Sequence, residues 1–347
     1  MKKVLSVFLA MLLCFLAVPF SVSAADESYP VEEKFSQNGP NSVKTIVFES
    51  GETAYTYYKI WYPENIENST EKYPVIVYCN GTGMTDEDVN TVNLMTAFAS
   101  WGYIAISNDH ESSGNADSAS KGLGLLLDLN ENSDSIFYGK VDVDKVGICG
   151  FSQGGSGAIN GASKGKQPNS SKFKSICALS APHKDLAASI LQNTPYDASK
   201  VSVPSFLVAG TGSTDAGSTT STGICPLGKG LIENMKKINS ENVIIGRYTG
   251  ADHGTIQKSA QPYIIAWFNY TLLNDSFSST AFVGENAELY SNSKWQDVYN
   301  KQSTDLPENP DPDDSLNLQD KVATKLLTKI SKILSKILEV IGKLLSF

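Results

Sequence analysis

A serine stands at the apex of a strand–turn–helix pattern in the middle of the chain. The apolar run Lys145–Cys149 precedes Gly150-Phe151-Ser152-Gln153-Gly154, and small residues continue to Ala158. A turn this sharp forces the serine into a strained backbone conformation, so glycine, which has no Cβ, suits the flanking positions. The hydroxyl would then stand clear of the sheet, with a helix N-terminus behind it. The pattern predicts a nucleophile elbow with Ser152 as the nucleophile.

The rest of the chain alternates between strand and helix patterns. Residues 43–62 alternate around a turn at Ser50-Gly51-Glu52, which predicts an antiparallel hairpin. The further predicted strands are 73–79, 103–107, 145–149, 173–179, 204–209 and 243–248, and the predicted helices include 85–100 (capped by Thr85 or Asp86), 116–129, 224–238 and 261–273. Such alternation predicts an α/β class: an α/β-hydrolase fold with a mostly parallel, doubly wound sheet after the hairpin.

The two ends of the chain differ from this central part. Residues 1–24 read as a signal peptide, with Lys2-Lys3, an apolar core and the small-residue site Val22-Ser23-Ala24, and predict a secreted protein. A membrane anchor is the alternative, but the apolar segment is short and Pro19 interrupts it. We expect a hydrolase domain over 25–302, an acidic Pro-rich linker over 303–317 and a cationic amphipathic helix over 318–347.

Charge is distributed unevenly. The formal net charge is −9, but the signal segment contributes +2 and residues 321–347 contribute +5, which leaves −16 on the body between them. So acidic a body argues against binding to nucleic acid. The 318–347 helix could lie on an anionic membrane surface and hold the protein at the cell surface; docking on its own body and self-association are the alternatives.

Four cysteines remain after the signal segment: Cys79, Cys149, Cys177 and Cys225. The first three lie in predicted central strands, where small apolar side chains pack well, so packing is the simplest role. A disulfide is possible in an exported protein, but its pairing cannot be read from sequence. No spacing suggests zinc, and we expect no metal and no organic cofactor.

The general base must be His110, His183 or His253, because the chain has 3 histidines. His253 follows the last predicted strand of the alternating pattern, within Gly250-Ala251-Asp252-His253-Gly254. In the fold expected here the chain order is serine, acid, histidine, which favours His253. The other two follow earlier strands and do not come after an acid in that order.

The orienting acid is expected after the strand that precedes the last one. Asp215 stands there, and it should accept the Nδ1–H of the histidine; an N-cap or an Asx-turn is the alternative role. Asp252 adjoins the histidine and is poorly placed to orient its ring. The oxyanion donors should be the backbone N–H groups of Gln153 and of Thr82 in the loop after strand 73–79, with Gly81 as the alternative to Thr82.

These residues resemble the secreted α/β-hydrolases of the dienelactone hydrolase-like group, which includes cutinase-type polyesterases, platelet-activating-factor acetylhydrolases and chlorophyllases. The resemblance runs from about Asn38 to Asn274 and is most specific from Gly139 through Gly155. It implies the nucleophile, acid and base roles at Ser152, Asp215 and His253, and oxyanion amides at Gln153 and Thr82.

The resemblance implies a serine esterase whose partner is an ester substrate, either a polyester or cutin or a short-chain acyl ester. Lipid acylhydrolase and carbohydrate esterase activities use the same machinery, and a non-catalytic surface module on a hydrolase scaffold is the alternative from another class. The polyesterases carry His and Met at the positions of Phe151 and Gln153, and an aromatic residue where Thr82 stands. Their tryptophan after the strand that ends before Ser180-Ala181-Pro182-His183 has no counterpart here.

Overall fold

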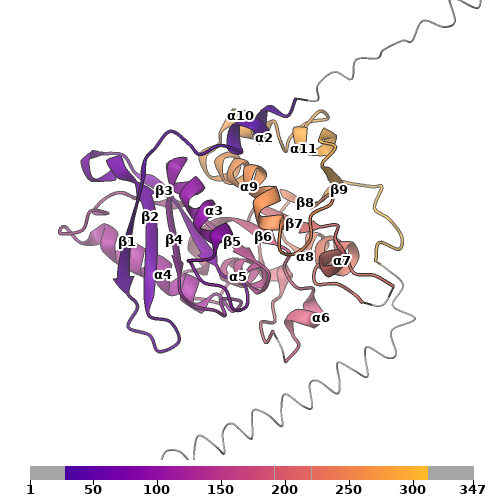
Figure 1. The fold of residues 1–347 in the computed structure, drawn as a ribbon, viewed down its shortest axis with the longest axis horizontal. Helices are drawn as coiled ribbons and strands as arrows, with labels where there is room; N and C mark the ends of the chain where they lie inside the picture. Colours follow the sequence, from indigo (N-terminus) through magenta and orange to yellow (C-terminus); the bar gives the residue numbers. More distant parts are fainter. Residues whose placement is uncertain (1–27, 191, 220, 312–347) are drawn as a thin grey trace, which may run out of the picture.

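The computed structural model describes residues 28–190, 192–219 and 221–311. Within them one sheet has the strand order β1-β2-β4-β3-β5-β6-β7-β8-β9 (Figure 1). The strands are β1 (Val43–Glu49), β2 (Tyr57–Pro63), β3 (Tyr73–Cys79), β4 (Ile104–Asn108), β5 (Val141–Phe151), β6 (Phe173–Leu179), β7 (Ser205–Gly210), β8 (Val243–Tyr248) and β9 (Trp295–Asn300).

Parallel pairing runs through the centre of this sheet, from β4 to β8. The β1–β2 and β2–β4 pairs at one edge and the β8–β9 pair at the other are antiparallel. Parallel neighbours require crossover connections, and the helices between the strands supply them. The predicted hairpin and the predicted α/β-hydrolase type of sheet are therefore both confirmed.

The helices cover both faces of the sheet. They are α2 (Pro30–Phe35), α3 (Val89–Ser100), α4 (Asp117–Glu131), α5 (Gln153–Ala162), α6 (Lys184–Ala187), α7 (Ser213–Ala216), α8 (Glu233–Lys237), α9 (Ile256–Leu273), α10 (Ser276–Ser279) and α11 (Glu288–Ser291). Short 3-10 turns are η1 (Glu64–Asn68), η2 (Ser170–Lys172) and η3 (Ala198–Lys200), and η4 (Leu227–Ile232) is a π-helix.

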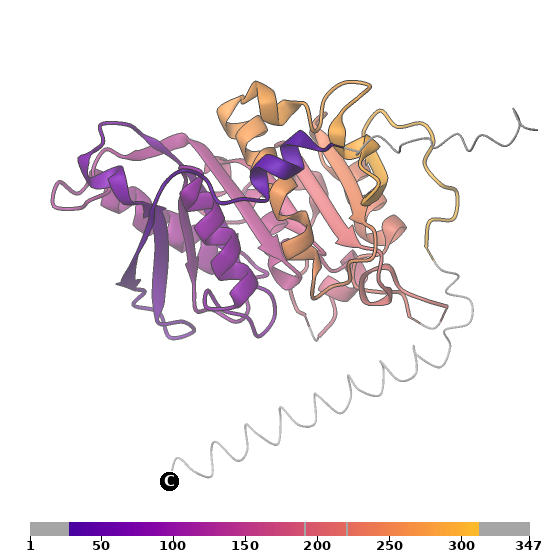
Figure 2. The ribbon, with the colours of Figure 1, turned by 45° about the horizontal axis from the view of Figure 1, so that its top comes forward.

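Two apolar cores result, one on each face. Alternate residues of β3 belong to different cores. Val75 and Val77 belong to the core under α4 and α5, whereas Ile76 and Tyr78 belong to the core under α3 and α9. The side chains of a strand point to opposite faces in turn, so a strand covered on both faces is apolar throughout. The short α2 contacts α9 and closes the second core, as the rotated view shows (Figure 2).

Several predicted boundaries were wrong. Helix α3 begins at Val89 rather than at residue 85, because the Asp88 carboxylate accepts the N–H of Thr85 and holds a turn there. Helix α9 begins at Ile256 and includes Pro262, and the predicted 224–238 helix is divided into η4 and α8. Strand β9 and the helices α2, α10 and α11 were not predicted.

The acidic segment after β9 lies against the domain as far as it is described. Leu306 packs against the core under α4 and α5. The Asp311 carboxylate accepts the backbone N–H groups of Gly228 at 2.5 Å and Lys229 at 2.9 Å. The predicted signal peptide and the predicted 318–347 helix lie outside the described residues. Among the helices that are described, none combines the length and the apolar character that crossing a membrane requires.

Candidate active site

Ser152 occupies the sharp turn between β5 and α5, with φ at 54° and ψ at −123°. Side chains with a Cβ rarely adopt this region, and such strain concentrates at functional sites. Space around the turn is equally restricted: a Cβ on Gly150 would lie 2.0 Å from the carbonyl oxygen of Gly154, and one on Gly154 would lie 2.0 Å from that of Cys79. Glycine is therefore required on both sides of the serine.

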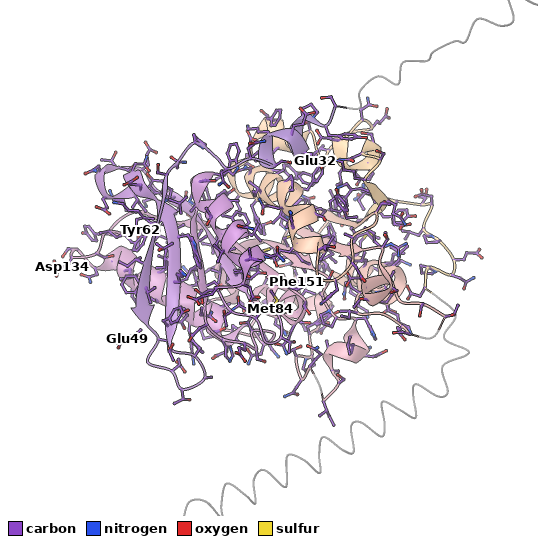
Figure 3. The ribbon with its side chains drawn as sticks, in the orientation of Figure 1. Glu32, Glu49, Tyr62, Met84, Asp134 and Phe151 are labelled. Atoms are coloured by element: carbon purple, nitrogen blue, oxygen red, sulfur yellow. The ribbon has the colours of Figure 1, made fainter. Side chains whose placement is uncertain are left out.

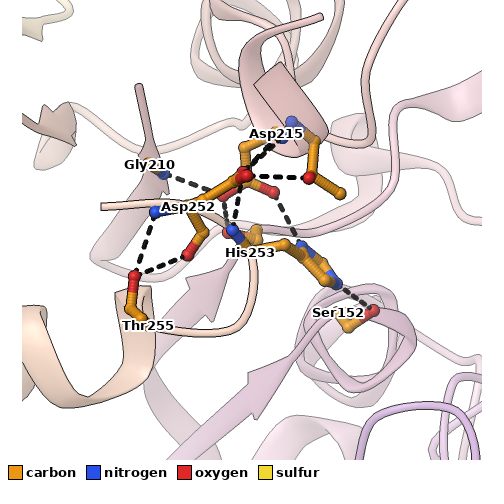
Figure 4. A network of polar contacts seen from close by, with 8 residues as sticks. Ser152, Gly210, Asp215, Asp252, His253 and Thr255 are labelled. Atoms are coloured by element: carbon orange, nitrogen blue, oxygen red, sulfur yellow. Dashed lines mark hydrogen bonds and ion pairs between the residues drawn. The ribbon is translucent and has the colours of Figure 1, made fainter. Parts of the chain in front are cut away.

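The structure brings the three predicted triad side chains together, although they are far apart in the sequence. The Ser152 Oγ lies 2.9 Å from the His253 Nε2, and the His253 Nδ1 lies 2.7 Å from the Asp215 Oδ1 (Figure 4). A proton on Nδ1 satisfies the carboxylate and leaves Nε2 free to accept the proton of the serine hydroxyl. The imidazole is largely buried, with 18% of the side chain exposed, and the carboxylate is wholly buried.

The second oxygen of Asp215 also has defined partners. Oδ2 accepts the hydroxyl of Ser180 at 2.5 Å and the backbone N–H of Gly210 at 2.8 Å. With Oδ1 facing the histidine, these donors hold the carboxylate in one orientation. Ser180 follows β6 and has φ at 44°, a conformation that the sequence pattern does not reveal. Its contact with the acid was missed by the sequence analysis.

The predicted oxyanion donors lie on neighbouring segments beside Ser152. Gln153 is the first residue of α5, so its backbone N–H has no partner within the helix. Thr82 lies in the turn after β3, where Gly81 accepts the N–H of Met84 and Gly83 donates to Glu111. The side chains of both predicted donors reach Gln192: Thr82 Oγ1 lies 3.3 Å from its Oε1, and Gln153 Nε2 donates to its backbone oxygen at 3.1 Å.

An aromatic side chain packs against the imidazole. The ring of Phe151 lies 4.8 Å from the His253 ring between centroids, at an interplanar angle of 37°. Phe151 and Met84 both approach Gly81, so the turn after β3 packs against the elbow (Figure 3). The Phe151 ring limits the orientations that the imidazole can adopt on that side.

The other two histidines have different surroundings. The ring of His110 lies 5.1 Å from the Tyr55 ring, and burial lowers its pKa, so it is neutral at physiological pH. His183 precedes α6, and its backbone N–H donates to the carbonyl of Ile224. Of the three histidines, His253 is the one whose ring lies within hydrogen-bond distance of Ser152.

Neither the cysteines nor the acidic groups of the described residues form a recognisable metal centre. Cys79, Cys149, Cys177 and Cys225 are all buried and free of disulfide bonds. Across the three described ranges, no group of three or more His, Cys, Asp and Glu side chains is arranged to hold a metal ion.

Comparison with known proteins places the chain in a family. Residues 30–301, which span α2 through β9, match the family model PETase, described as PET hydrolase-like. A comparison with curated proteins gave no match. The matched stretch contains the elbow, the acid loop and the histidine loop. Because the match covers most of the chain, the protein belongs to the PETase family of PET hydrolase-like α/β-hydrolases.

Proposed function

We propose that the protein is a serine esterase that hydrolyses carboxylic esters through a covalent acyl-enzyme. Family membership supports ester hydrolysis in general. The observation that carries the finer proposal is the contact between the Ser152 hydroxyl and the His253 Nε2 at 2.9 Å, continued to Asp215. Nucleophile, base and orienting acid thus stand in hydrogen-bond sequence, as acyl transfer requires.

Acylation begins when His253 Nε2 takes the proton of Ser152 as Oγ attacks the ester carbonyl carbon. The carbonyl oxygen becomes an oxyanion, which the backbone N–H groups of Gln153 and Thr82 stabilise. The imidazolium then gives its proton to the alcohol oxygen as the C–O bond breaks, and the alcohol leaves. Asp215 holds the imidazole in the required tautomer and balances the positive charge that forms on it.

Deacylation repeats these roles with water as the nucleophile. His253 takes a proton from the water as it attacks the acyl carbon of the Ser152 ester. The oxyanion forms at the same amides, and its collapse returns the proton to Ser152 Oγ and releases the carboxylic acid. The enzyme regains its starting state, so one histidine serves both half-reactions.

The substrate class proposed is the polyester or a short-chain carboxylic ester. The family description names a polyester hydrolase, which supports the first. Thr82 and Phe151 differ from the residues that the polyesterases carry at these positions. Hydrolysis rates on a polyester film and on p-nitrophenyl esters of increasing chain length would separate the two classes.

Replacing Ser152 with alanine tests the mechanism. We expect turnover of p-nitrophenyl butyrate to fall by roughly 10⁴- to 10⁶-fold, because the nucleophile is lost. Labelling by a fluorophosphonate should disappear from the variant, and mass spectrometry of the wild type should place the adduct on Ser152.

Ser156→Ala is the matched control for this test. Ser156 lies in α5, the helix that Ser152 precedes. Its buried hydroxyl has no hydrogen-bond partner among the described residues, so the variant should keep wild-type turnover and labelling. Wild-type hydrolysis by folded Ser152→Ala protein would contradict the proposed function.

Two further parts of the proposal rest on sequence patterns alone. They are export directed by residues 1–24, and contact of residues 318–347 with an anionic membrane surface or a second copy of the chain. Both segments lie outside the described residues. Sequencing the N-terminus of the mature protein tests export, and liposome co-sedimentation with and without residues 318–347 tests membrane contact.

A further inference from the structure

The acid and the base of the triad stand on two different loops. Asp215 belongs to the loop and short helix after β7, and His253 belongs to the loop between β8 and α9. A hydrogen bond of 2.7 Å between their side chains requires that these loops keep a fixed separation. Strands β7 and β8 are paired as far as Gly210 and Tyr248, so beyond that point the separation of the two side chains depends on contacts between the loops themselves.

The carboxylate of Asp252 spans the two loops. Its Oδ1 accepts three backbone N–H groups, from Thr214 at 3.1 Å, Asp215 at 3.2 Å and His253 at 2.8 Å. Its Oδ2 accepts the Thr214 hydroxyl at 2.8 Å. One side chain therefore binds the main chain of both the acid and the base, without acting on the imidazole ring.

The surrounding backbone is shaped to admit this carboxylate. A Cβ on Gly212 would lie 2.3 Å from the Asp252 Cγ, so a larger residue would occupy the place of the carboxylate. The N–H of Gly212 donates to the carbonyl of Ala251 at 2.8 Å, and a Cβ on Gly210 would lie 2.4 Å from the same oxygen. The two loops are thus in direct contact on either side of Asp252.

The charge of Asp252 suits its partners. Burial alone would raise its pKa, but the hydrogen bonds from Thr214 and from the backbone of His253, Asp215 and Thr214 outweigh burial and lower it. The group is therefore ionised at neutral pH, and an ionised carboxylate only accepts hydrogen bonds. Every group that contacts its two oxygens here is a donor.

We propose that Asp252 is a positioning residue that joins the acid loop to the histidine loop and thereby holds Asp215 and His253 at hydrogen-bond distance. The inference rests on the proposed esterase function. Asp252 was expected to be poorly placed to orient the imidazole ring, and the described contacts agree: its carboxylate binds the backbone that carries the ring, while the ring itself pairs with Asp215.

Asp252→Ala tests the proposal. Misplacement of a catalytic group by about 1 Å can cost roughly 100-fold in rate, so we expect kcat on p-nitrophenyl butyrate to fall about 10- to 100-fold with KM changed less than about threefold. The rate of fluorophosphonate labelling should fall in parallel. In the proton NMR spectrum, the low-field resonance of His253 Nδ1–H should weaken or broaden, since its bond to Asp215 is no longer held.

Asp252→Asn is the conservative variant. Its amide oxygen can still accept the three backbone N–H groups, and its NH₂ group can donate to the Thr214 hydroxyl. It should recover most of the lost kcat and restore the low-field resonance. Should the alanine variant fail to fold, Thr214→Val removes the Oδ2 partner alone, and a fall in kcat of about threefold or more is then expected.

Asp275→Ala is the control for a merely structural effect. Asp275 also accepts a backbone N–H and a hydroxyl, both from Ser278, but it lies at α10, away from the triad loops. It should lose stability while keeping kcat and the NMR signature. Wild-type kcat and an unchanged resonance in folded Asp252→Ala, or no recovery in Asp252→Asn, would overturn the proposal. Failure of the esterase function itself would show separately, as activity in Ser152→Ala.

Discussion

At the scale of single residues, the elbow shows how backbone strain is maintained at the site. Ser152 has φ at 54°, and contacts around Gly150 and Gly154 leave no room for a Cβ. An isolated turn would relax from this conformation. Here β5 and α5 fix both ends of the turn, so the packing of the domain maintains the strain at Ser152, whose hydroxyl faces the His253 Nε2.

Gly150→Ala should therefore damage both stability and reactivity. The new methyl group would meet the Gly154 carbonyl at 2.0 Å, so the turn must shift. Overpacking of this kind costs about 1–3 kcal/mol, and fluorophosphonate labelling should slow as Ser152 moves. Urea unfolding and labelling kinetics measure the two effects.

Gly124→Ala is the comparison variant, because a methyl group at that position has room. In α4 the nearest atom to the new methyl group would lie at 3.5 Å, an ordinary contact. Alanine is the better helix former, so this variant should gain about 0.5–1 kcal/mol and keep its labelling rate. Equal stability of the two variants would show that the elbow is not crowded.

The sequence predicts the site residues better than it predicts their supports. Ser152, Asp215 and His253 follow β5, β7 and β8 in a known order, and a parallel sheet brings the carboxyl ends of its strands to one edge. The contacts of Ser180 and Asp252 depend on loop conformations, including the φ of 44° at Ser180, that no periodicity encodes. These supports are visible only in three dimensions.

At the scale of elements, a buried polar cluster attaches α2, the first helix of the described residues, to α11, the last of them. The carboxylate of Glu288 in α11 accepts the backbone N–H groups of Val31 at 2.7 Å and Glu32 at 2.8 Å, at the start of α2. It also accepts the Tyr263 hydroxyl from α9 at 2.7 Å. The first N–H groups of α2 have no partner within the helix, and the Glu288 carboxylate accepts two of them. Figure 2 shows α2 lying beside these late elements.

Glu288→Gln should loosen this attachment. A glutamine has one acceptor oxygen, and its NH₂ group would face an N–H donor, which leaves buried donors without partners. We expect a loss of about 1–3 kcal/mol in unfolding free energy and faster amide exchange in α2. Exposed Glu33, on the same helix, is the control: Glu33→Gln should change stability by less than about 0.5 kcal/mol.

Element existence was easier to predict than element limits. Strand β3 and hairpin β1–β2 followed from long apolar or alternating runs. Strand β9 was not predicted because Trp295–Asn300 has no continuous apolar run, and it pairs with β8. Helix α3 was predicted to begin too early because Thr85 and Asp86 have the side chains of helix N-caps. In the structure the Thr85 N–H donates to the Asp88 carboxylate, and this turn could not be predicted without knowing where the Asp88 side chain points.

At the scale of the whole molecule, the pKa values of some carboxylates are lowered by the fold and that of Asp86 is raised, so these groups contribute to the response to acid with opposite signs. Burial alone would raise the pKa of Asp109 and of Asp275, but hydrogen bonds from Thr56 and Tyr57 to the first, and from Ser278 to the second, lower both. Asp86 is the contrary case: burial raises its pKa, and its bonds from Tyr57 and Lys59 offset this only in part.

The sign of each contribution follows from these directions. A carboxylate whose folded pKa is lowered stabilises the fold above its unfolded pKa of about 4, and this stability is lost as pH falls through the folded value. A carboxylate whose folded pKa is raised has the opposite effect: its contribution is present at low pH and is lost as pH rises through the folded pKa. Asp109, Asp252 and Asp275 thus oppose Asp86 in the acid range.

Unfolding free energy should therefore decline below about pH 4, where the lowered carboxylates begin to protonate in the unfolded state and then in the fold. Urea unfolding at a series of pH values from 7 to 3 measures the decline. Asp109→Asn removes a lowered carboxylate, so its decline should be shallower than that of the wild type. Asp86→Asn removes the opposing group, so its decline should be steeper. Identical slopes for both variants would mean that groups other than these carboxylates control the response to acid.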